Sequence, residues 1–199
     1  TTLELDLAVS RDSQLVVSHE PWMSHHICSH PDGTPVTEGE EDRLAIFQLP
    51  YAQVRQFDCG RRGNAAFPEQ QAQPAVKPTL AEVVEAVRAY CTREDRPRPA
   101  YNIEIKSQPE WDGDKTPAPE AFARLVLAEV KRLDIAEHSC IQSFDPRVLQ
   151  AVHRFDPKIT TALLVANPHG VAANVEALGY RPPIYSPYYK LLAANVVDT

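Results

Sequence analysis

Two short segments in which charged and apolar residues alternate constrain the fold of this 199-residue chain most strongly. Residues 3–7 read LELDL, and residues 101–107 read YNIEIKS. Side chains in a β-strand point alternately to opposite faces, so each segment should bury its aliphatic residues on one face and present polar groups on the other. The residues that share a polar face are then Glu4 and Asp6 in the first strand, and Asn102, Glu104 and Lys106 in the second.

These polar faces predict a metal site. The second strand precedes segments with helical spacing, as in a parallel sheet covered by helices, whose strands are usually buried on both faces. Buried carboxylates are costly unless they are paired or bind a cation, and Ca²⁺ and Mg²⁺ prefer oxygen ligands. We therefore expect Glu4, Asp6 and Glu104 to bind a divalent cation, with Lys106 close to an anionic oxygen. A solvated strand at a sheet edge would show the same alternation.

Strand and helix patterns alternate from residue 78 onward. Thr79 with Glu82 forms a capping box, and Asp145 followed by Pro146 is a typical helix start. The sequence predicts strands over 101–107, 140–144, 160–165 and 184–186, and helices over 80–87, 122–133, 148–152, 171–178 and 191–197. About six of the eight strands of a (β/α)₈ barrel are recognisable, so we expect an α/β fold, a TIM barrel incomplete at both ends.

A long aperiodic segment follows the second strand-like run. Residues 21–77 show no sustained period, and loops of this length inside a domain are usually functional or disordered. We interpret residues 21–77 as an insertion that covers a site within a single domain of residues 1–199. The four cysteines are far apart in sequence, and we expect all of them to be free thiols: Cys28, Cys59, Cys91 and Cys140.

Charge and hydropathy exclude some classes of protein. The net charge is −7 and no basic run offers a surface for phosphate backbones, which argues against nucleic-acid binding. No apolar stretch is long enough for a membrane span. A small anionic substrate stays compatible with the composition, because a bound cation can override the global charge. The sequence indicates neither the cellular compartment nor the oligomeric state.

His19 is a candidate for proton transfer. It ends the apolar run of residues 15–18, and an imidazole titrates near neutral pH. The same sequence pattern is also expected for a histidine in a solvent-exposed loop that has no catalytic role. His25, His26 and His30 match no standard zinc spacing, so we interpret them as surface residues or a pocket rim.

The motifs in order resemble those of the glycerophosphodiester phosphodiesterase family. The resemblance comprises residues 3–7, 15–20, 102–106 and 142–145, and residues 78–82 resemble the helix start before the family's Glu-x-Lys strand. The order and spacing agree across essentially the whole chain.

The resemblance implies a TIM-barrel enzyme that hydrolyses a glycerophosphodiester to glycerol 3-phosphate and an alcohol. Glu4, Asp6 and Glu104 would bind Ca²⁺ or Mg²⁺, and Lys106 would lie near the phosphate. His19 corresponds to the second catalytic histidine of the family. The implied partner is a small-molecule substrate, without nucleic acid or stable membrane insertion.

Two departures leave other functions open. Glu20 stands where the family usually has Asp, and nothing matches the family's first His-Arg-Gly motif, since Arg61-Arg62-Gly63 is out of order. The family's last strand also has no counterpart, so we expect a barrel without its first and last strands. The alternatives are a non-catalytic metal- or phosphate-binding homologue and a phospholipase D-like barrel enzyme.

Overall fold

The computed structural model describes residues 1–192, which form two compact units. The first unit contains Thr1–Asp6, Pro97–Asp112 and the chain from Ala118 onward. The second contains Leu7–Arg96 and Gly113–Pro117. Most of the helix predicted over residues 191–197 lies outside the described residues. The prediction of one domain over residues 1–199 stays a prediction.

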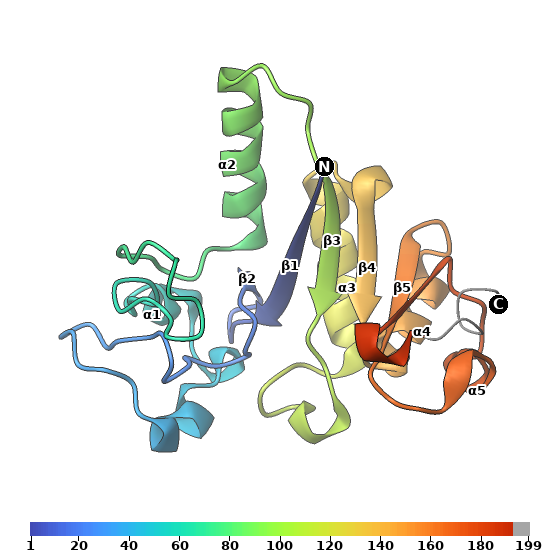
Figure 1. Cartoon of the computed structure of the whole chain (residues 1–199), viewed down its shortest axis with the longest axis horizontal. Coiled ribbons are helices and arrows are strands. Elements are labelled where there is room, and N and C mark those ends of the chain that lie inside the picture. Colours follow the sequence, from blue (N-terminus) through green and yellow to red (C-terminus); the bar gives the residue numbers. More distant parts are fainter. Residues whose placement is uncertain (193–199) are drawn as a thin grey trace. The chain divides into compact units, whose positions relative to one another are not determined.

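A parallel sheet organises the first unit (Figure 1). Its strand order is β1-β3-β4-β5-β6, and β3 to β6 pair in parallel with their neighbours. The strands are β1 (Thr2–Val9, which continues into the second unit), β3 (Ala100–Ile105), β4 (Ser139–Ser143), β5 (Thr160–Val165) and β6 (Ile184–Pro187). The predicted strands after residue 100 are therefore confirmed to within a few residues.

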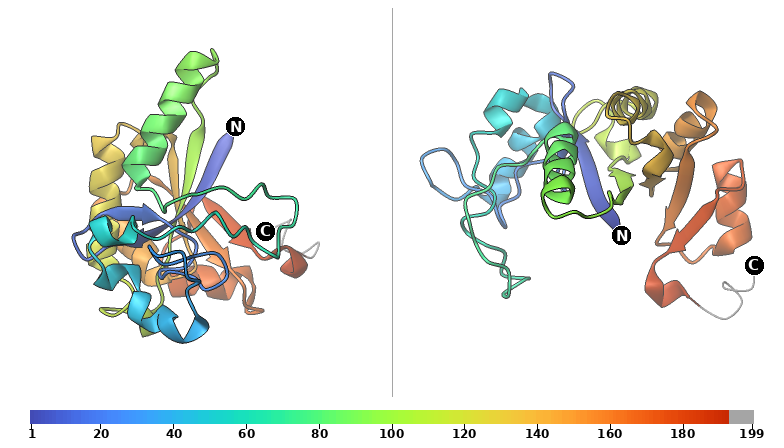
Figure 2. Two further views of the ribbon diagram at one scale, coloured as in Figure 1. Left: turned by 90° about the vertical axis from the view of Figure 1, so that its left-hand side faces the viewer. Right: turned by 90° about the horizontal axis from the view of Figure 1, so that it is seen from above.

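Helices connect these parallel strands and lie along one side of them, as the view from above in Figure 2 shows. They are α3 (Pro119–Arg132), α4 (Pro146–Phe155) and α5 (Gly170–Leu178), with short 3₁₀ turns at Pro109–Trp111, Ala136–His138 and Tyr189–Leu191. The stripe of Phe122, Val126 and Val130 on α3 is fully buried. Helix α4 begins as predicted, because the Asp145 side chain accepts a hydrogen bond from the Arg147 backbone N–H.

The second unit begins with an antiparallel pair. The end of β1 pairs with β2 (Leu15–Val17), with Leu7 opposite Val17. This pair departs from the parallel arrangement that the helix–strand alternation favours, because the short connection of residues 10–14 reverses the chain directly. Helix α2 (Leu80–Arg93) follows later, and its predicted capping box between Thr79 and Glu82 is present.

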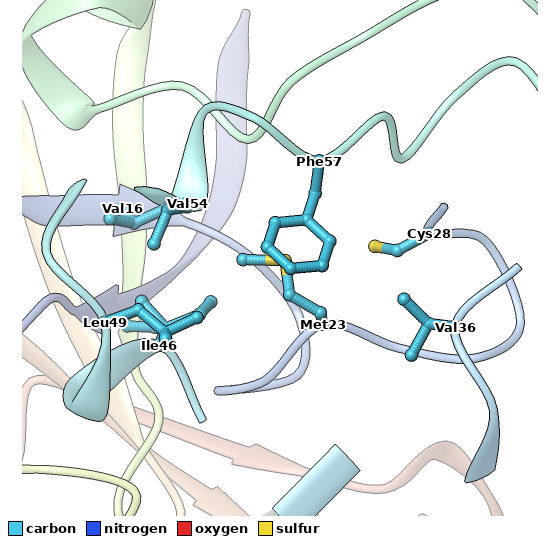
Figure 3. Packing of buried hydrophobic residues seen from close by; sticks show 9 residues of the cluster. Val16, Met23, Cys28, Val36, Ile46, Leu49, Val54 and Phe57 are labelled. Atoms are coloured by element: carbon cyan, nitrogen blue, oxygen red, sulfur yellow. The ribbon is translucent and has the colours of Figure 1, made fainter. Parts of the chain in front are cut away.

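The segment predicted as an insertion is ordered around a small core that it shares with β1 and β2. It contains 3₁₀ turns at Glu38–Leu44 and Ile46–Gln48 and the short helix α1 (Tyr51–Val54). Figure 3 shows how its apolar side chains pack together around Met23, which is fully buried. The cluster consists of Ala8, Val16, Met23, Cys28, Val36, Ile46, Leu49, Val54 and Phe57.

A disulfide bond within this segment corrects one sequence prediction. Cys28 and Cys59 are bonded, whereas Cys91 and Cys140 are not part of a disulfide. The two bonded residues are 31 positions apart in sequence, and an antiparallel bridge between Ser29 and Asp58 brings their loops together. The expectation of four free thiols was therefore wrong for this pair, because the contact depends on loop packing that cysteine spacing does not reveal.

Within residues 1–192, no helix is both long and apolar enough to cross a membrane.

Candidate functional site

The structure brings three predicted carboxylates together in the first unit. Glu4 and Asp6 lie on β1, and Glu104 lies on β3. One carboxylate oxygen of each lies within 4.8 Å of the others, and within residues 1–192 no other cluster of histidine, cysteine and acidic side chains meets this condition. We call these three residues the carboxylate cluster. It forms because the two strands are neighbours in the sheet and their polar side chains point to the same face.

Lys106 bridges two members of the carboxylate cluster. It directly follows β3, and its Nζ lies 2.9 Å from Glu104 Oε1 and 3.2 Å from Asp6 Oδ1. These three side chains are mostly buried, with exposed fractions of 14% for Lys106, 15% for Asp6 and 8% for Glu104. Such ion pairs shielded from solvent are screened less by salt than surface pairs are. Lys106 therefore places a fixed positive charge beside the carboxylates.

The charge balance of the cluster favours a further cation. Burial raises the pKa of Glu104; Lys106 opposes this effect, Asp6 reinforces it, and the resulting pKa is about 7. For Lys106, burial disfavours the charged form, but the two carboxylates outweigh this and raise its pKa. The cluster has three carboxylates and one neighbouring ammonium group, so it keeps a formal negative charge when all its carboxylates are ionised. A bound divalent cation would favour the ionised form of Glu104.

Two amide side chains extend the cluster through hydrogen bonds. Gln142 on β4 donates from Nε2 to Glu4 Oε1 at 2.9 Å, and Asn102 on β3 donates from Nδ2 to Gln142 Oε1 at 2.8 Å. Asn102 Oδ1 is buried and has no hydrogen-bond partner. The Asn102 carbonyl oxygen is therefore a further oxygen donor for a cation near Glu4, in addition to the carboxylates.

These residues fit a hard divalent cation. All the donors of the carboxylate cluster are oxygen atoms, which suits Mg²⁺ and Ca²⁺ and does not suit a thiolate- or imidazole-preferring metal. The alternation of residue types predicted Glu4, Asp6, Glu104 and Lys106. It did not assign a role to Gln142, although Gln142 pairs with Glu104 in the register of β3 and β4 and so belongs to the same region of the sheet.

His19 belongs to the second unit. It lies just beyond β2, its side chain is 71% exposed, and its Nδ1 lies 2.9 Å from Glu20 Oε1. This contact favours the ionised form of Glu20. Burial alone would raise the pKa of Glu20, but the hydrogen bond and the charge of His19 outweigh burial, and the pKa is lowered. The carboxylate of Glu20 thus holds one ring nitrogen of His19, and the orientation of the imidazole is defined.

Two histidines of the insertion contact acidic residues. His25 Nδ1 lies 2.7 Å from Glu41 Oε1, and His30 Nε2 lies 3.4 Å from Glu40 Oε1. A cavity of about 240 Å³ is lined by Glu20, Ser24, His26, Ile27 and Asn64, together with two alanines. His26 thus lines a pocket in the second unit, as the sequence interpretation allowed.

The chain matches a known protein family over most of its length. The model of the glycerophosphoryl diester phosphodiesterase family matches residues 1–188. The chain belongs to this family. Its members are phosphoric diester hydrolases with a TIM-barrel fold, which confirms the predicted fold class and the family resemblance. No protein of curated function gives a significant match to the sequence.

Solved structures of glycerophosphodiester phosphodiesterases share the fold. A candidate member of the family from Silicibacter pomeroyi DSS-3 is 24% identical, with a TM-score of 0.79 over 99% of this chain and 69% of that chain. A phosphodiesterase from Oleispira antarctica in complex with the product sn-glycerol-3-phosphate is 20% identical, with a TM-score of 0.67 over 98% of this chain and 66% of that chain.

A glycerophosphodiester phosphodiesterase from Thermotoga maritima is 20% identical, with a TM-score of 0.56 over 94% of this chain and 60% of that chain. The chain therefore spans between 60% and 69% of the length of these three relatives.

Proposed function

We propose that this member of the glycerophosphodiester phosphodiesterase family hydrolyses a glycerophosphodiester, in a reaction that depends on a divalent cation, to sn-glycerol 3-phosphate and an alcohol. Family membership supports the reaction class. The observation that carries the proposal is the convergence of Glu4, Asp6 and Glu104 beside Lys106, because it gives a strongly charged oxygen-donor site in a chain of this family.

The carboxylate cluster would hold Ca²⁺ or Mg²⁺. When bound, the ion would act as a Lewis acid toward the phosphoryl oxygens. Lys106 would donate to a phosphoryl oxygen, because its ammonium lies between Asp6 and Glu104 and carries charge throughout the neutral pH range. Gln142 would keep Glu4 in its ligating orientation by donating to Oε1, as outer-sphere groups commonly do at metal sites.

His19 would transfer the proton at the bridging oxygen of the substrate. Its Nδ1 contacts Glu20, so Nε2 is the nitrogen that can exchange a proton with a substrate oxygen. Because Glu20 holds Nδ1, His19 can present Nε2 to the leaving alcohol and act as the general acid. The motif order of the family carries this assignment.

The test measures release of sn-glycerol 3-phosphate from glycerophosphocholine before and after metal depletion. We expect activity to disappear with a chelator and return with Mg²⁺ or Ca²⁺. Glu104→Gln should abolish it, whereas Glu176→Gln, which changes an exposed carboxylate on α5, should leave it intact. Full activity of Glu104→Gln, or activity that resists the chelator, would contradict the proposal.

A substrate panel tests the two alternatives. Cleavage of sphingomyelin in preference to glycerophosphocholine would favour a phospholipase D-like enzyme. Tight cation binding without turnover of either substrate would favour a non-catalytic homologue.

A further inference from the structure

We infer that Lys77 is a positioning residue that holds the His19 loop, residues 18–20, in the orientation that His19 needs for proton transfer. This inference rests on the proposed function of His19. Lys77 is the last residue of the segment predicted as an insertion, and it had no assigned role in the sequence interpretation.

The backbone around Lys77 is fixed against β2. The Val17 N–H donates to Pro78 O at 2.8 Å, and Val16 forms an antiparallel bridge with Thr79. The hydroxyl oxygen of Tyr51 lies 3.2 Å from Lys77 O. These contacts place the side chain of Lys77 beside the loop that follows β2, although the two segments are 59 residues apart in sequence.

A continuous chain of contacts joins Lys77 to His19. The buried ammonium donates from Nζ to Ser18 Oγ at 2.6 Å, and Ser18 Oγ in turn donates to the backbone carbonyl of Glu20. Glu20 Oε1 then contacts His19 Nδ1 at 2.9 Å. Through Ser18 and Glu20, Lys77 thus constrains both the backbone of the His19 loop and the carboxylate that orients the imidazole.

Burial of this lysine is difficult to explain by stability alone. Lys77 is 6% exposed, and burial lowers its pKa to about 8 while the charge of Glu20 opposes the shift. Replacing a buried charge with an apolar group of similar volume is often neutral or stabilising. An apolar side chain would therefore serve the fold at least as well, which points to a role for the amine in the His19 loop.

Few other titratable groups lie around the amine. Glu20 and His19 come from the loop itself, and Tyr51 comes from α1. Glu82, at the start of α2, accepts a hydrogen bond from the Tyr51 hydroxyl. Of these, Glu20 is the group whose charge acts on Lys77. Deprotonation of Lys77 would remove that attraction and loosen the loop.

The central test is Lys77→Met, which keeps the length of the side chain and removes its charge. We expect kcat for glycerophosphocholine to fall about tenfold or more, because a misplaced catalytic group costs on the order of ten- to a hundredfold. KM should change little, and the melting temperature should stay the same or rise. Lys77→Arg should restore part of kcat. Lys115→Met, which removes another ion-paired lysine of the same unit, is the matched control and should leave kcat unchanged.

The pH profile separates positioning from a structural role. The ratio of the wild-type rate to the Lys77→Arg rate should fall as pH rises through about 8, where Lys77 loses its proton. A guanidinium does not deprotonate in this range, and the ratio cancels the pH dependence that the general acid His19 contributes to both proteins. An unchanged kcat in Lys77→Met, or an identical basic limb in the wild type and Lys77→Arg, would overturn the inference.

The mobility of the His19 ring can be measured without any enzymatic activity, so it tests the role of Lys77 independently of the proposed function. NMR relaxation of the His19 ring should show greater mobility in Lys77→Met than in the wild type and in Lys115→Met. If the wild type hydrolyses no glycerophosphodiester, the proposed function fails. Unchanged mobility of the His19 ring would then refute the positioning of the loop by Lys77, and increased mobility would support it.

Discussion

The carboxylate cluster and the His19 loop are held in place in different ways. The cluster stands on two strands, and the regular backbone sets the face of the sheet to which Glu4, Asp6 and Glu104 point. The His19 loop has no regular structure, and its orientation depends on side-chain hydrogen bonds that include one from Lys77, 59 residues away. Chemistry built on strands follows from local periodicity, whereas chemistry built on loops depends on distant partners.

Asp6→Asn should have the largest effect and tests the strand-borne site. Asparagine keeps the shape of the side chain but removes a charge from the carboxylate cluster. We expect the rate of glycerophosphodiester hydrolysis to fall on the order of a thousandfold, since metal-assisted charge stabilisation contributes several kcal/mol. Steady-state kinetics at saturating Mg²⁺ or Ca²⁺ measures the effect.

Asp134→Asn provides the matched control, because it makes the same change at an exposed position of the first unit. Its left-handed backbone conformation, with φ of 52°, is one that asparagine accepts. If Asp6→Asn lowers the rate no more than Asp134→Asn does, the carboxylate cluster is not the catalytic site.

Removal of the Cys28–Cys59 disulfide should have the next largest effect, and it should act on the loop-borne region. The double variant Cys28→Ser, Cys59→Ser loses a cross-link between residues 31 positions apart, so we expect the free energy of unfolding to fall by about 3–4 kcal/mol. Hydrogen exchange should show the loss in residues 21–77. Cys140→Ser, which changes a free cysteine of β4, should leave that segment unaffected. Equal destabilisation of β3 to β6 by the double variant would show that the two regions do not differ in this way.

Gln142→Ala tests how much a side-chain hydrogen bond adds to the position that the strand gives Glu4. It removes the hydrogen bond that Glu4 accepts, while the strand keeps the direction of the carboxylate. We expect the metal concentration for half-maximal activity to rise about tenfold, with a smaller change in kcat, as for other outer-sphere groups. Calorimetric titration with Mg²⁺ or Ca²⁺ checks the affinity. Gln150→Ala, in helix α4, is a suitable control, and a Gln142→Ala protein with unaltered affinity would contradict the role of this residue.

Glu82→Gln should have the smallest effect, and it depends on pH. Burial disfavours ionisation of Glu82, but hydrogen bonds from Tyr51, the Thr79 backbone and Arg55 outweigh burial and lower its pKa to about 2. Glutamine can keep the capping box through its one oxygen, so the variant removes the charge and the acceptor that faces Arg55. Because the Glu82 side chain is 40% exposed, solvent screening limits the loss of stability near pH 7 to about 0.5–1 kcal/mol.

The sign of this effect follows from the lowered pKa. The contribution of Glu82 is present above the unfolded pKa of about 4.5 and disappears as pH falls toward 2. Urea unfolding of the wild type and Glu82→Gln at pH 7, 4 and 2.5 should therefore show a difference that shrinks with acidification. A difference that grows in acid would be incompatible with the contacts of Glu82.

The parts of the fold that could be predicted are those with local causes. Thr79 and Asp145 cap their helices through residues two or three positions away, and the stripe on α3 repeats with helical spacing. The antiparallel pairing of β2 and the Cys28–Cys59 bond were not predicted. Both depend on which segments meet in space, and the aperiodic sequence of residues 21–77 carries no signal for this.

The same division applies to the site. Alternation along β1 and β3 is visible in the sequence and indicates Glu4, Asp6, Glu104 and Lys106, and the structure places these four together. Lys77 carries no such signal, because a lysine before a proline at the end of an irregular segment usually faces solvent. Its burial follows from the pairing of β2 with residues 78 and 79, which local sequence does not indicate.

The alternation along β1 also decides which sequence changes this site can accept. Apolar residues at positions 3, 5 and 7 can be exchanged for one another without reorienting Glu4 or Asp6, since they occupy the opposite face. A single-residue deletion between Glu4 and Leu7 would turn one side of the strand onto the other face and separate the two carboxylates. Apolar exchanges on that face therefore keep both carboxylates on the polar face, whereas a change in the number of residues between Glu4 and Leu7 does not.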